Sequence, residues 1–233
     1  MPQPLPQRLL QAYEEAGNRA IQAAADVARG VHQPGAALTA RQHPRLIRSL
    51  KLREAAALRK WAEGKALLLD THEFEAKWEA QRRIGGQEND VYLEGNRIFK
   101  CNNLSYHLSY ADFFDRLALH NLLFPGAPLQ FEGFLLRAEE LFPVMSQPAI
   151  RAVRGARRDE VEALMGRLGF TRSRNDDYRH PEGILVEDLH DENVFVDQGG
   201  DLIVVDPVIY LARGRPAKKT SSKSCHPSRR SLL

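Results

Sequence analysis

Two short apolar runs near the end of the chain constrain its fold more than any other feature. The runs Val194–Val196 and Leu202–Val205 are rich in β-branched residues, and the polar segment between them contains Gly199–Gly200. A glycine pair is a preferred two-residue turn between antiparallel strands. With that turn, Asn193 and Asp206 would lie opposite each other, with Cα atoms ~4.5–5.5 Å apart and side chains on one face. Amide and carboxylate oxygens are ligands that Mg²⁺ accepts, so the hairpin predicts a metal site at its open end.

A second pair of glycines lies upstream, before a predicted strand–turn–strand unit. Gly85 and Gly86 precede the strand Val91–Leu93, and glycine lets backbone amides approach phosphate oxygens without a Cβ in the way. The next strand, Arg97–Lys100, ends with a lysine. Alternation along that strand places Lys100 on the inner face of the sheet, where an unpaired ammonium is costly. We therefore expect Lys100 to contact both a nucleotide phosphate and an acidic side chain.

The acidic partner of Lys100 is expected on the helix that follows these strands. Residues Tyr110–Leu123 are predicted to be helical, because Pro125 and the glycine after it stop the pattern. Both Asp112 and Asp115 lie on this helix. We expect Asp115 to be the partner, because Asp112 lies in the first turn, where an acid also favours the start of a helix.

The order of these features resembles that of the protein-kinase-like superfamily. Residues 188–193 fit D-L-x-x-x-N, the core of the protein-kinase catalytic loop, and the glycines, Lys100 and Asp206 follow kinase order. The closer resemblance is to the serine/threonine/tyrosine kinase-type domains of polyvalent proteins from phages and conjugative elements. It rests on the phrases Gly-Gly-x-Glu-x-x-Val-Tyr (85–92), Leu-His-Asn-Leu-Leu-Phe-Pro (119–125) and Asp-Leu-His (188–190), and it covers residues 67–211. The last phrase also resembles aminoglycoside phosphotransferases, which are small-molecule kinases.

The resemblance implies an α+β fold of the reduced, bilobal protein-kinase-like type. An antiparallel sheet would form the N-lobe, a minimal C-lobe would carry the catalytic hairpin, and helices would precede both. The implied activity is that of an ATP- and Mg²⁺-dependent phosphotransferase that acts on a hydroxyl of an unknown protein or small molecule. The implied site residues are Asp188 (the base) and Lys100 for catalysis, Gly85, Gly86, Val91, Lys100, Asp115 and Gln147 (the adenine hinge) for the nucleotide, and Asn193 and Asp206 for the metal.

Parts of the kinase pattern are replaced in this chain. Val186–Glu187 stands where His-Arg precedes the catalytic aspartate, Asp206–Val208 replaces D-F-G, and few residues follow that would form a peptide-docking helical lobe. Two alternatives therefore accompany the kinase interpretation. The first is a pseudokinase that binds nucleotide and transfers nothing. The second is a mobile-element adaptor whose helices and basic tail bind nucleic acid.

The chain is predicted to have three parts: an N-terminal helical segment (1–66), the kinase-like domain (67–211) and a basic, disordered tail (212–233). Predicted helices cover Arg8–Gly30 and Pro44–Gly64. From Pro207 onward there are seven Lys or Arg and no acid, which leaves 26 basic and 30 acidic residues in the remainder. This distribution argues against a nucleic-acid footprint spread over the fold, but it is compatible with weak anion or nucleic-acid contacts made by the basic tail.

The composition favours a protein of the cytoplasm. No run approaches the ~18 apolar residues that a membrane span requires, and the first residues lack the pattern of a signal sequence. The two cysteines, Cys101 and Cys225, do not suggest a disulfide framework, which fits a reducing compartment. The expected partners are ATP and a phosphate acceptor, without a membrane.

Overall fold

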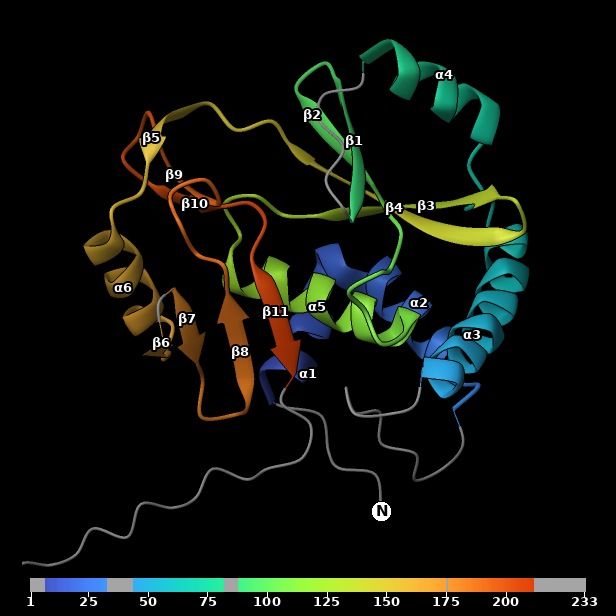
Figure 1. Ribbon diagram of the computed structural model, residues 1–233, viewed down its shortest axis with the longest axis horizontal. Helices are drawn as coiled ribbons and strands as arrows, with labels where there is room; N and C mark the ends of the chain where they lie inside the picture. The colour runs from blue at the N-terminus through green and yellow to red at the C-terminus, as the bar shows by residue number, and fades with distance from the viewer. Residues whose placement is uncertain (1–6, 33–43, 82–87, 175, 212–233) are drawn as a thin grey trace, which may run out of the picture.

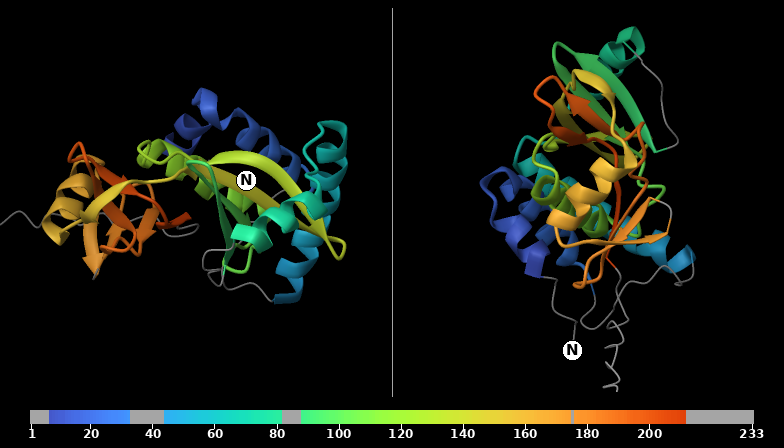
Figure 2. Two further views of the ribbon diagram at one scale, coloured as in Figure 1. Left: turned by 90° about the horizontal axis from the view of Figure 1, so that it is seen from above. Right: turned by 90° about the vertical axis from the view of Figure 1, so that its left-hand side faces the viewer.

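The computed structural model describes residues 7–32, 44–81, 88–174 and 176–211, which form a mixed α and β structure. The antiparallel strands and the helices belong to the α+β class that the sequence predicts. We call α1–α5 with β1–β4 the N-terminal half, and α6 with β5–β11 the C-terminal half; the two halves lie side by side (Figures 1 and 2). The helices are α1 (Gln7–Glu14), α2 (Arg19–Arg29), α3 (Pro44–Gly64), α4 (Thr71–Gln81), α5 (Tyr110–Leu123) and α6 (Arg158–Arg167).

The N-terminal half is built around a four-stranded antiparallel sheet in the order β1-β2-β4-β3. Because side chains alternate along each strand, the sheet presents two apolar faces. One face packs on α4 through Phe74 and Tyr92, and the other packs on α5, where Phe114 contacts Phe131 and Phe134. The strands are β1 (Asn89–Glu94), β2 (Arg97–Asn102), β3 (Gln130–Arg137) and β4 (Glu140–Pro148).

The C-terminal half contains two smaller antiparallel sheets. Their orders are β10-β9-β5 and β11-β8-β7-β6, and α6 packs beside them. The predicted hairpin is present as β9 and β10, whereas β5, β6 and β7 were not predicted. The strands are β5 (Ala152–Gly155), β6 (Thr171–Arg174), β7 (Asp177–Arg179), β8 (Ile184–Glu187), β9 (Val194–Asp197), β10 (Leu202–Val204) and β11 (Val208–Leu211).

The prediction of one helix over Arg8–Gly30 is wrong, because the chain breaks between α1 and α2. A short 3₁₀ turn, Ala16–Asn18, separates them. The side-chain amide of Asn18 donates a hydrogen bond to the carbonyl of Ala12, 2.7 Å away, so a side chain takes over a carbonyl at the end of α1. The two helices can therefore take different directions. The predicted helices Pro44–Gly64 and Tyr110–Leu123 are confirmed by α3 and α5, while α4 was not predicted.

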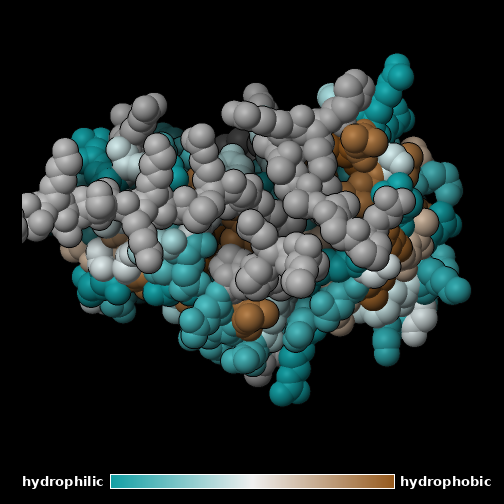
Figure 3. All heavy atoms as spheres, turned by 90° about the horizontal axis from the view of Figure 1, so that it is seen from below, coloured by the Kyte–Doolittle hydropathy of each residue, from teal (hydrophilic) through white to brown (hydrophobic). Residues whose placement is uncertain are grey.

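One apolar core joins the two halves and includes the N-terminal helices. Leu9 and Ile21 are fully buried in the same cluster as Leu119 of α5 and Val186 of β8. On the face seen in Figure 3, hydrophilic side chains predominate among the described residues and hydrophobic ones appear in isolated groups. None of the helices that the structure describes combines the length and apolar character needed to cross a membrane.

Candidate functional site

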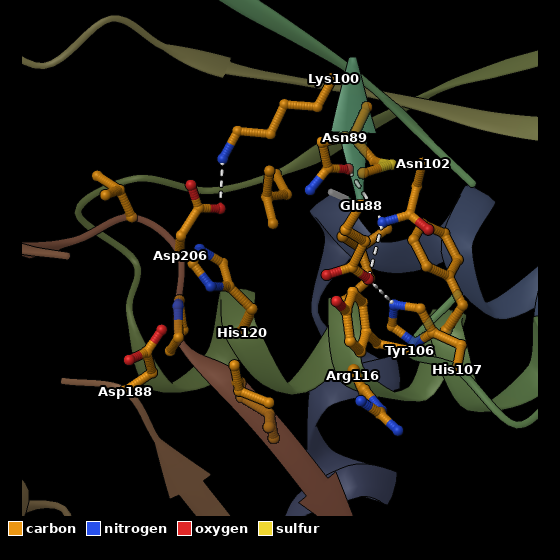
Figure 4. Close-up of a pocket in the computed structure, with 18 of the residues that line it drawn as sticks. Glu88, Asn89, Lys100, Asn102, Tyr106, His107, Arg116, His120, Asp188 and Asp206 are labelled. Atoms are coloured by element: carbon orange, nitrogen blue, oxygen red, sulfur yellow. Dashed lines mark hydrogen bonds and ion pairs between the residues drawn. The ribbon is translucent and has the colours of Figure 1, made fainter. Parts of the chain in front are cut away.

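A cavity of about 450 Å³ lies between α5, β2 and the segment that follows β10. Its size is within the range of small-molecule sites. Lys100, Asp188, Asn193 and Asp206 all line it, although they come from distant parts of the chain. Figure 4 shows Lys100, Asp206, Asp188 and His120 toward one end, and Glu88, Asn102, Tyr106 and His107 toward the other. The structure thus brings four residues predicted for catalysis or metal binding to one place.

The predicted register of the hairpin β9–β10 is wrong by one residue. Val194 pairs with Val204, and the carbonyl of Asn193 accepts a hydrogen bond from the amide of Val205, 3.0 Å away. Asn193 therefore lies opposite Val205, and Asp206 is one position further along the other arm. The direct opposition of Asn193 and Asp206, from which the sequence argument derived the metal site, does not occur.

The chemistry of the hairpin loop explains this shift. The carboxylate of Asp197 accepts hydrogen bonds from the amides of Gly199 and Asp201, at 2.8 Å and 2.9 Å. The backbone of Asp197 also pairs with Asp201, so the connection has three residues rather than two. Gly200 takes the left-handed conformation, φ +86°, that a three-residue hairpin requires at its last position. The carboxylate of Asp197, and not the glycine pair alone, sets the register.

Asn193 and Asp206 nevertheless both reach the cavity, because both arms of the hairpin end there. Asn193 immediately precedes β9, and Asp206 lies two residues past the end of β10. Neither residue is inside the paired part of the strands, so the side-chain alternation of the ladder no longer fixes their direction. Their proximity therefore comes from the loop geometry at the open end.

Lys100 is paired with Asp206 and not, as the sequence predicted, with Asp115. The Lys100 ammonium is buried on the inner face of β2, and its Nζ lies 2.7 Å from Oδ1 of Asp206. The carboxylate of Asp115 instead meets Tyr13 and Arg29 on the opposite side of α5. Asp112, the other candidate, accepts hydrogen bonds from Arg116 and from the amide of Leu108. Neither acid of α5 is therefore available to Lys100.

The face of α5 that lines the cavity carries Phe113, Arg116, Leu117 and His120. These positions are spaced by three or four residues, so they form one stripe of the helix. None of the four is acidic. Asp115 lies two positions, about 200° around the helix, from Leu117 and is therefore on the other side of α5.

His120 occupies the part of this stripe near the ion pair. It is buried, and its Nε2 lies 3.0 Å from the carbonyl of Ala127. Burial lowers the pKa of His120 to about 4, so the ring is neutral at physiological pH and Nε2–H donates to that carbonyl. His120 therefore adds no positive charge next to Lys100.

Asp188 is the first residue of the loop 188–193, and contacts within this loop hold both its backbone and its side chain. Its φ is +67°, a conformation that costs energy for a non-glycine residue and that concentrates at functional sites. The side-chain amide nitrogen of Asn193 donates a hydrogen bond to Oδ2 of Asp188 at 3.1 Å and another to the backbone carbonyl of Asp188 at 2.9 Å. His190 Nε2 lies 3.2 Å from the other carboxylate oxygen. Because Nδ1 of His190 accepts a hydrogen bond from the amide of Glu192, Nε2, which faces this oxygen, is the ring nitrogen that carries a proton.

The loop from Asp188 to Asn193 is also packed against the chain. Leu189 is buried beneath it, and a Cβ placed on Gly155 of β5 would lie only 2.7 Å from the carbonyl oxygen of Asp191. Only a glycine fits at that distance, so Gly155 lets the two backbones meet closely. The carboxylate of Asp188 thus projects, about half exposed, from a loop that is fixed on its other side.

The far end of the cavity contains polar residues that sequence reasoning missed. Glu88 accepts hydrogen bonds from His107 Nε2 at 2.8 Å and from the Asn102 amide at 3.1 Å. Burial alone raises the pKa of Glu88, but these hydrogen bonds and the nearby Arg116 hold it below its ordinary value, so the carboxylate is ionised. Burial lowers the pKa of His107. Asn102 was detectable in the sequence, because it alternates with Lys100 on the same face of β2.

The remaining predicted nucleotide residues lie outside this cavity or outside the described structure. Gly85 and Gly86 fall outside the described residues. Val91 lies directly opposite Lys100 in the β1–β2 ladder and therefore on the same face of the sheet. Gln147 is buried in β4 opposite Ile98, and it does not line the cavity. The roles of these four residues toward a nucleotide stay predictions.

Comparison with known protein families identifies a match over more than half of the chain. Residues 51–213 match the family described as serine/threonine/tyrosine kinase found in polyvalent proteins. No curated protein and no solved structure matches the chain. The matched region holds β1 to β11 and every residue of the cavity. The chain belongs to this family of serine/threonine/tyrosine kinases found in polyvalent proteins.

Proposed function

We propose that the protein transfers the γ-phosphoryl group of ATP to a hydroxyl of a protein or a small molecule, with Mg²⁺ as the metal. The observation that carries this proposal is the convergence of Lys100, Asp188, Asn193 and Asp206 on one cavity. Phosphoryl transfer needs a base or orienting carboxylate, a cation on the phosphates and oxygen ligands for the metal, all within one site. The four side chains supply these groups.

The arrangement of the two halves supports a reduced, bilobal kinase-like fold. The sheet β1-β2-β4-β3 with α5 corresponds to an N-lobe that carries the lysine, and the C-terminal half carries the loop of Asp188 and the hairpin. The ion pair of Lys100 and Asp206 crosses between the halves. A nucleotide that lies in the cleft would therefore contact both halves at once.

Asp188 is proposed as the group that orients the acceptor hydroxyl and takes its proton. Its two carboxylate oxygens are held by Asn193 and His190, so its position is fixed before a substrate arrives. As the hydroxyl oxygen bonds to the γ-phosphorus, the bond from that phosphorus to the β–γ bridging oxygen breaks and ADP leaves. The hydroxyl proton passes to Asp188. The exposed side of the carboxylate is where the acceptor approaches.

Lys100 is proposed to bind the phosphates of ATP. Its ammonium is buried, so its charge acts in a medium of low dielectric constant, where it stabilises a phosphate more than it would in water. The ion pair with Asp206 holds the ammonium at the cavity in the absence of a nucleotide. When phosphates enter, Lys100 gains a second anionic partner beside the first.

The residues present fit Mg²⁺. Asn193 uses only its amide nitrogen for hydrogen bonds within the described chain, which leaves Oδ1 open, and Asp206 uses only Oδ1. One amide oxygen and one carboxylate oxygen match the usual supply of one or two protein ligands, with phosphate and water completing the shell. Among the described residues no three His, Cys, Asp or Glu side chains form an all-protein cage. When bound, the metal would neutralise charge on the β- and γ-phosphates.

The proposal is tested by nucleotide binding to the full chain. Isothermal titration with MgATP should show binding to the wild type that is weakened at least tenfold in Lys100→Met and in Asp206→Asn, because each loses a charged contact. Lys77→Met is the matched control, since Lys77 is a half-exposed lysine of α4 whose partners are Glu73 and Glu94. If Lys100→Met binds MgATP as tightly as the control does, the assignment of the nucleotide site is wrong.

A nucleotide-binding protein without transfer activity is the second candidate. It is favoured by the α5 stripe, which presents Arg116 and His120 to the cavity and no acid. In this candidate, Lys100 keeps Asp206 as its only acidic partner among the described residues. Release of ADP from labelled ATP distinguishes the phosphotransferase from the pseudokinase. A pseudokinase binds MgATP but releases no ADP with any of a panel of hydroxyl acceptors.

A further inference from the structure

The helices α1 and α2 lie outside the matched family region, which begins at residue 51 inside α3. Both helices contact α5, and α1 also contacts the C-terminal half through Arg8. We propose that α1 and α2 position α5 against the C-terminal half and thereby set the shape of the cavity. The effect on nucleotide binding rests on the function proposed above; the effect on α5 itself does not.

The central contact is a buried carboxylate on α5. Asp115 is fully buried, and its Oδ1 accepts hydrogen bonds from the Tyr13 hydroxyl of α1 and from the guanidinium of Arg29 of α2. Arg29 also donates to the Tyr13 hydroxyl at 3.0 Å. A carboxylate without water is tolerated only where charge and donors are supplied, so α5 is stable at this position only with both helices in place.

A second set of contacts fixes the end of α5 toward its C-terminus. The amide nitrogen of Asn121 donates to Oδ1 of Asn18 at 2.7 Å, and the Asn18 amide in turn contacts the carbonyls of Ala12 and Ala118. Asn18 is buried in the turn between α1 and α2. The 3₁₀ segment that separates α1 from α2 therefore also holds α5, at Ala118 and Asn121, on the C-terminal side of Asp115.

The contact with the C-terminal half is made by Arg8. Its guanidinium donates to the carbonyl of Leu168 and to Nε2 of His180, both at 3.1 Å, and its backbone amide donates to the carboxylate of Glu182. His180 and Glu182 lie between β7 and β8, and β8 leads directly into Asp188. The helix α1 thus joins α5 to the strand that carries the proposed catalytic loop.

The two faces of α5 explain how these contacts reach the cavity. Asp115 faces α1 and α2, while its neighbour Arg116 and then His120 face the cavity. Asp115 and Arg116 are neighbours on one helix, so a change in α5 at Asp115 also displaces the side chains that line the cavity. Tyr13, Arg29 and Asp115 are therefore positioning residues, which touch no ligand themselves.

The first test compares two conservative variants of the full chain with a matched control. Tyr13→Phe removes one donor and Asp115→Asn removes the charge, and neither changes the side-chain volume much. Tyr92→Phe is the control, because Tyr92 is equally buried but packs on the α4 face of the sheet. Hydrogen exchange of amides 113–120 and the NMR signals of the His120 ring are measured without nucleotide, and the dissociation constant of MgATP is measured separately.

We expect both variants to raise the exchange rates of amides 113–120 about tenfold, because α5 loses its anchor and opens locally. The His120 ring signals should shift, and the MgATP dissociation constant should rise by about 3- to 30-fold. Tyr92→Phe should leave all three unchanged. Unchanged α5 exchange in both variants, or an equal rise throughout the chain, would overturn the proposal.

The second test addresses the contact made by Arg8. Arg8→Gln should raise amide exchange in residues 180–190, whereas Arg19→Gln should not, because Arg19 is an exposed arginine at the start of α2. If Arg8→Gln and Arg19→Gln have the same exchange pattern, α1 does not hold the C-terminal half. Both exchange experiments work without a nucleotide. A wild type that fails to bind MgATP would therefore refute the proposed function and leave the positioning of α5 to be judged from exchange alone.

Discussion

Lys100 and Asp206 meet across the cavity, with Nζ of the lysine 2.7 Å from Oδ1 of the aspartate. The environments of the two partners differ, because the Lys100 side chain is 6% exposed and that of Asp206 is 57% exposed. The ammonium is thus the buried partner and the carboxylate the solvated one. The same pair joins β2 of the N-terminal half to the end of the hairpin in the other half.

This asymmetry predicts unequal effects on stability. Asp206→Asn leaves a buried ammonium without its counter-charge and should lower the free energy of unfolding by about 2 kcal/mol. Lys100→Met removes the buried charge, keeps most of the volume and leaves Asp206 in water, so it should change the free energy by less than about 1 kcal/mol. Urea denaturation of both variants measures the difference. Equal losses would show that the ammonium does not depend on Asp206.

Asp188 is expected to matter for turnover and not for nucleotide affinity. Asp188→Asn keeps the shape of the side chain but cannot take the hydroxyl proton, so phosphoryl transfer should fall by about 10²- to 10⁴-fold. The dissociation constant of MgATP should stay within about threefold of the wild type, because the acceptor and not the nucleotide is bound by Asp188. The rate of transfer is measured with labelled ATP and a panel of hydroxyl acceptors. The dissociation constant is measured by isothermal titration with MgATP.

Asp191→Asn is the control for this prediction. Asp191 lies in the same loop, its side chain is exposed, and it does not line the cavity. Its substitution should leave both quantities unchanged. Transfer that persists in Asp188→Asn at the rate of Asp191→Asn would contradict the assignment of the base.

The hairpin shows how far local sequence signals reach. The strands, the loop between them and the arrival of Asn193 and Asp206 at one site were predictable from apolar runs and from the resemblance to kinases. The register was not predictable, because a glycine pair by itself indicates a two-residue turn. The carboxylate of Asp197 competes for the amides of Gly199 and Asp201 and lengthens the loop by one residue. Such a contact between a side chain and the backbone depends on geometry that a glycine pattern does not carry.

The partner of Lys100 was mispredicted for a different reason. An acid on the following helix was expected, and the helix exists, but its acids are used elsewhere by residues distant in sequence. Asp115 accepts a hydrogen bond from Tyr13 and forms an ion pair with Arg29, and these residues lie in helices that no sequence motif linked to the site. Only the packing of α1 and α2 on α5 determines which face of α5 is left for the cavity. Long-range packing of this kind is not encoded in the periodicity of a single helix.

Stability should depend on pH through His120. Its pKa falls from an ordinary 6.5 to about 4 in the folded protein, because the ring is buried. Between these values the unfolded chain binds a proton that the folded chain does not, so stability is complete above pH 6.5 and decreases as the pH falls toward 4. The contribution amounts to about 2 kcal/mol between pH 7 and pH 5.

Urea denaturation of the wild type and of His120→Gln at these two pH values isolates this contribution. Glutamine keeps a donor for the carbonyl of Ala127 and does not titrate, so the variant should lose about 2 kcal/mol less than the wild type on going from pH 7 to pH 5. Parallel losses in the two proteins would show that His120 titrates normally and is not sealed from water.

Gly155 is expected to be essential for the geometry of the Asp188 loop. A Cβ at this position would lie 2.7 Å from the carbonyl oxygen and 2.8 Å from the Cβ of Asp191, and neither atom belongs to the end of a flexible side chain. Gly155→Ala should therefore displace the loop, lower the free energy of unfolding by about 1–3 kcal/mol and reduce phosphoryl transfer more than tenfold.

Gly166→Ala is the matched control, because Gly166 lies in α6 with no atom within 4 Å of the added Cβ. There alanine should raise stability by about 0.5–1 kcal/mol, since it favours the helix. If Gly155→Ala keeps full stability and transfer, the backbone of β5 is not what holds the loop of Asp188 in place.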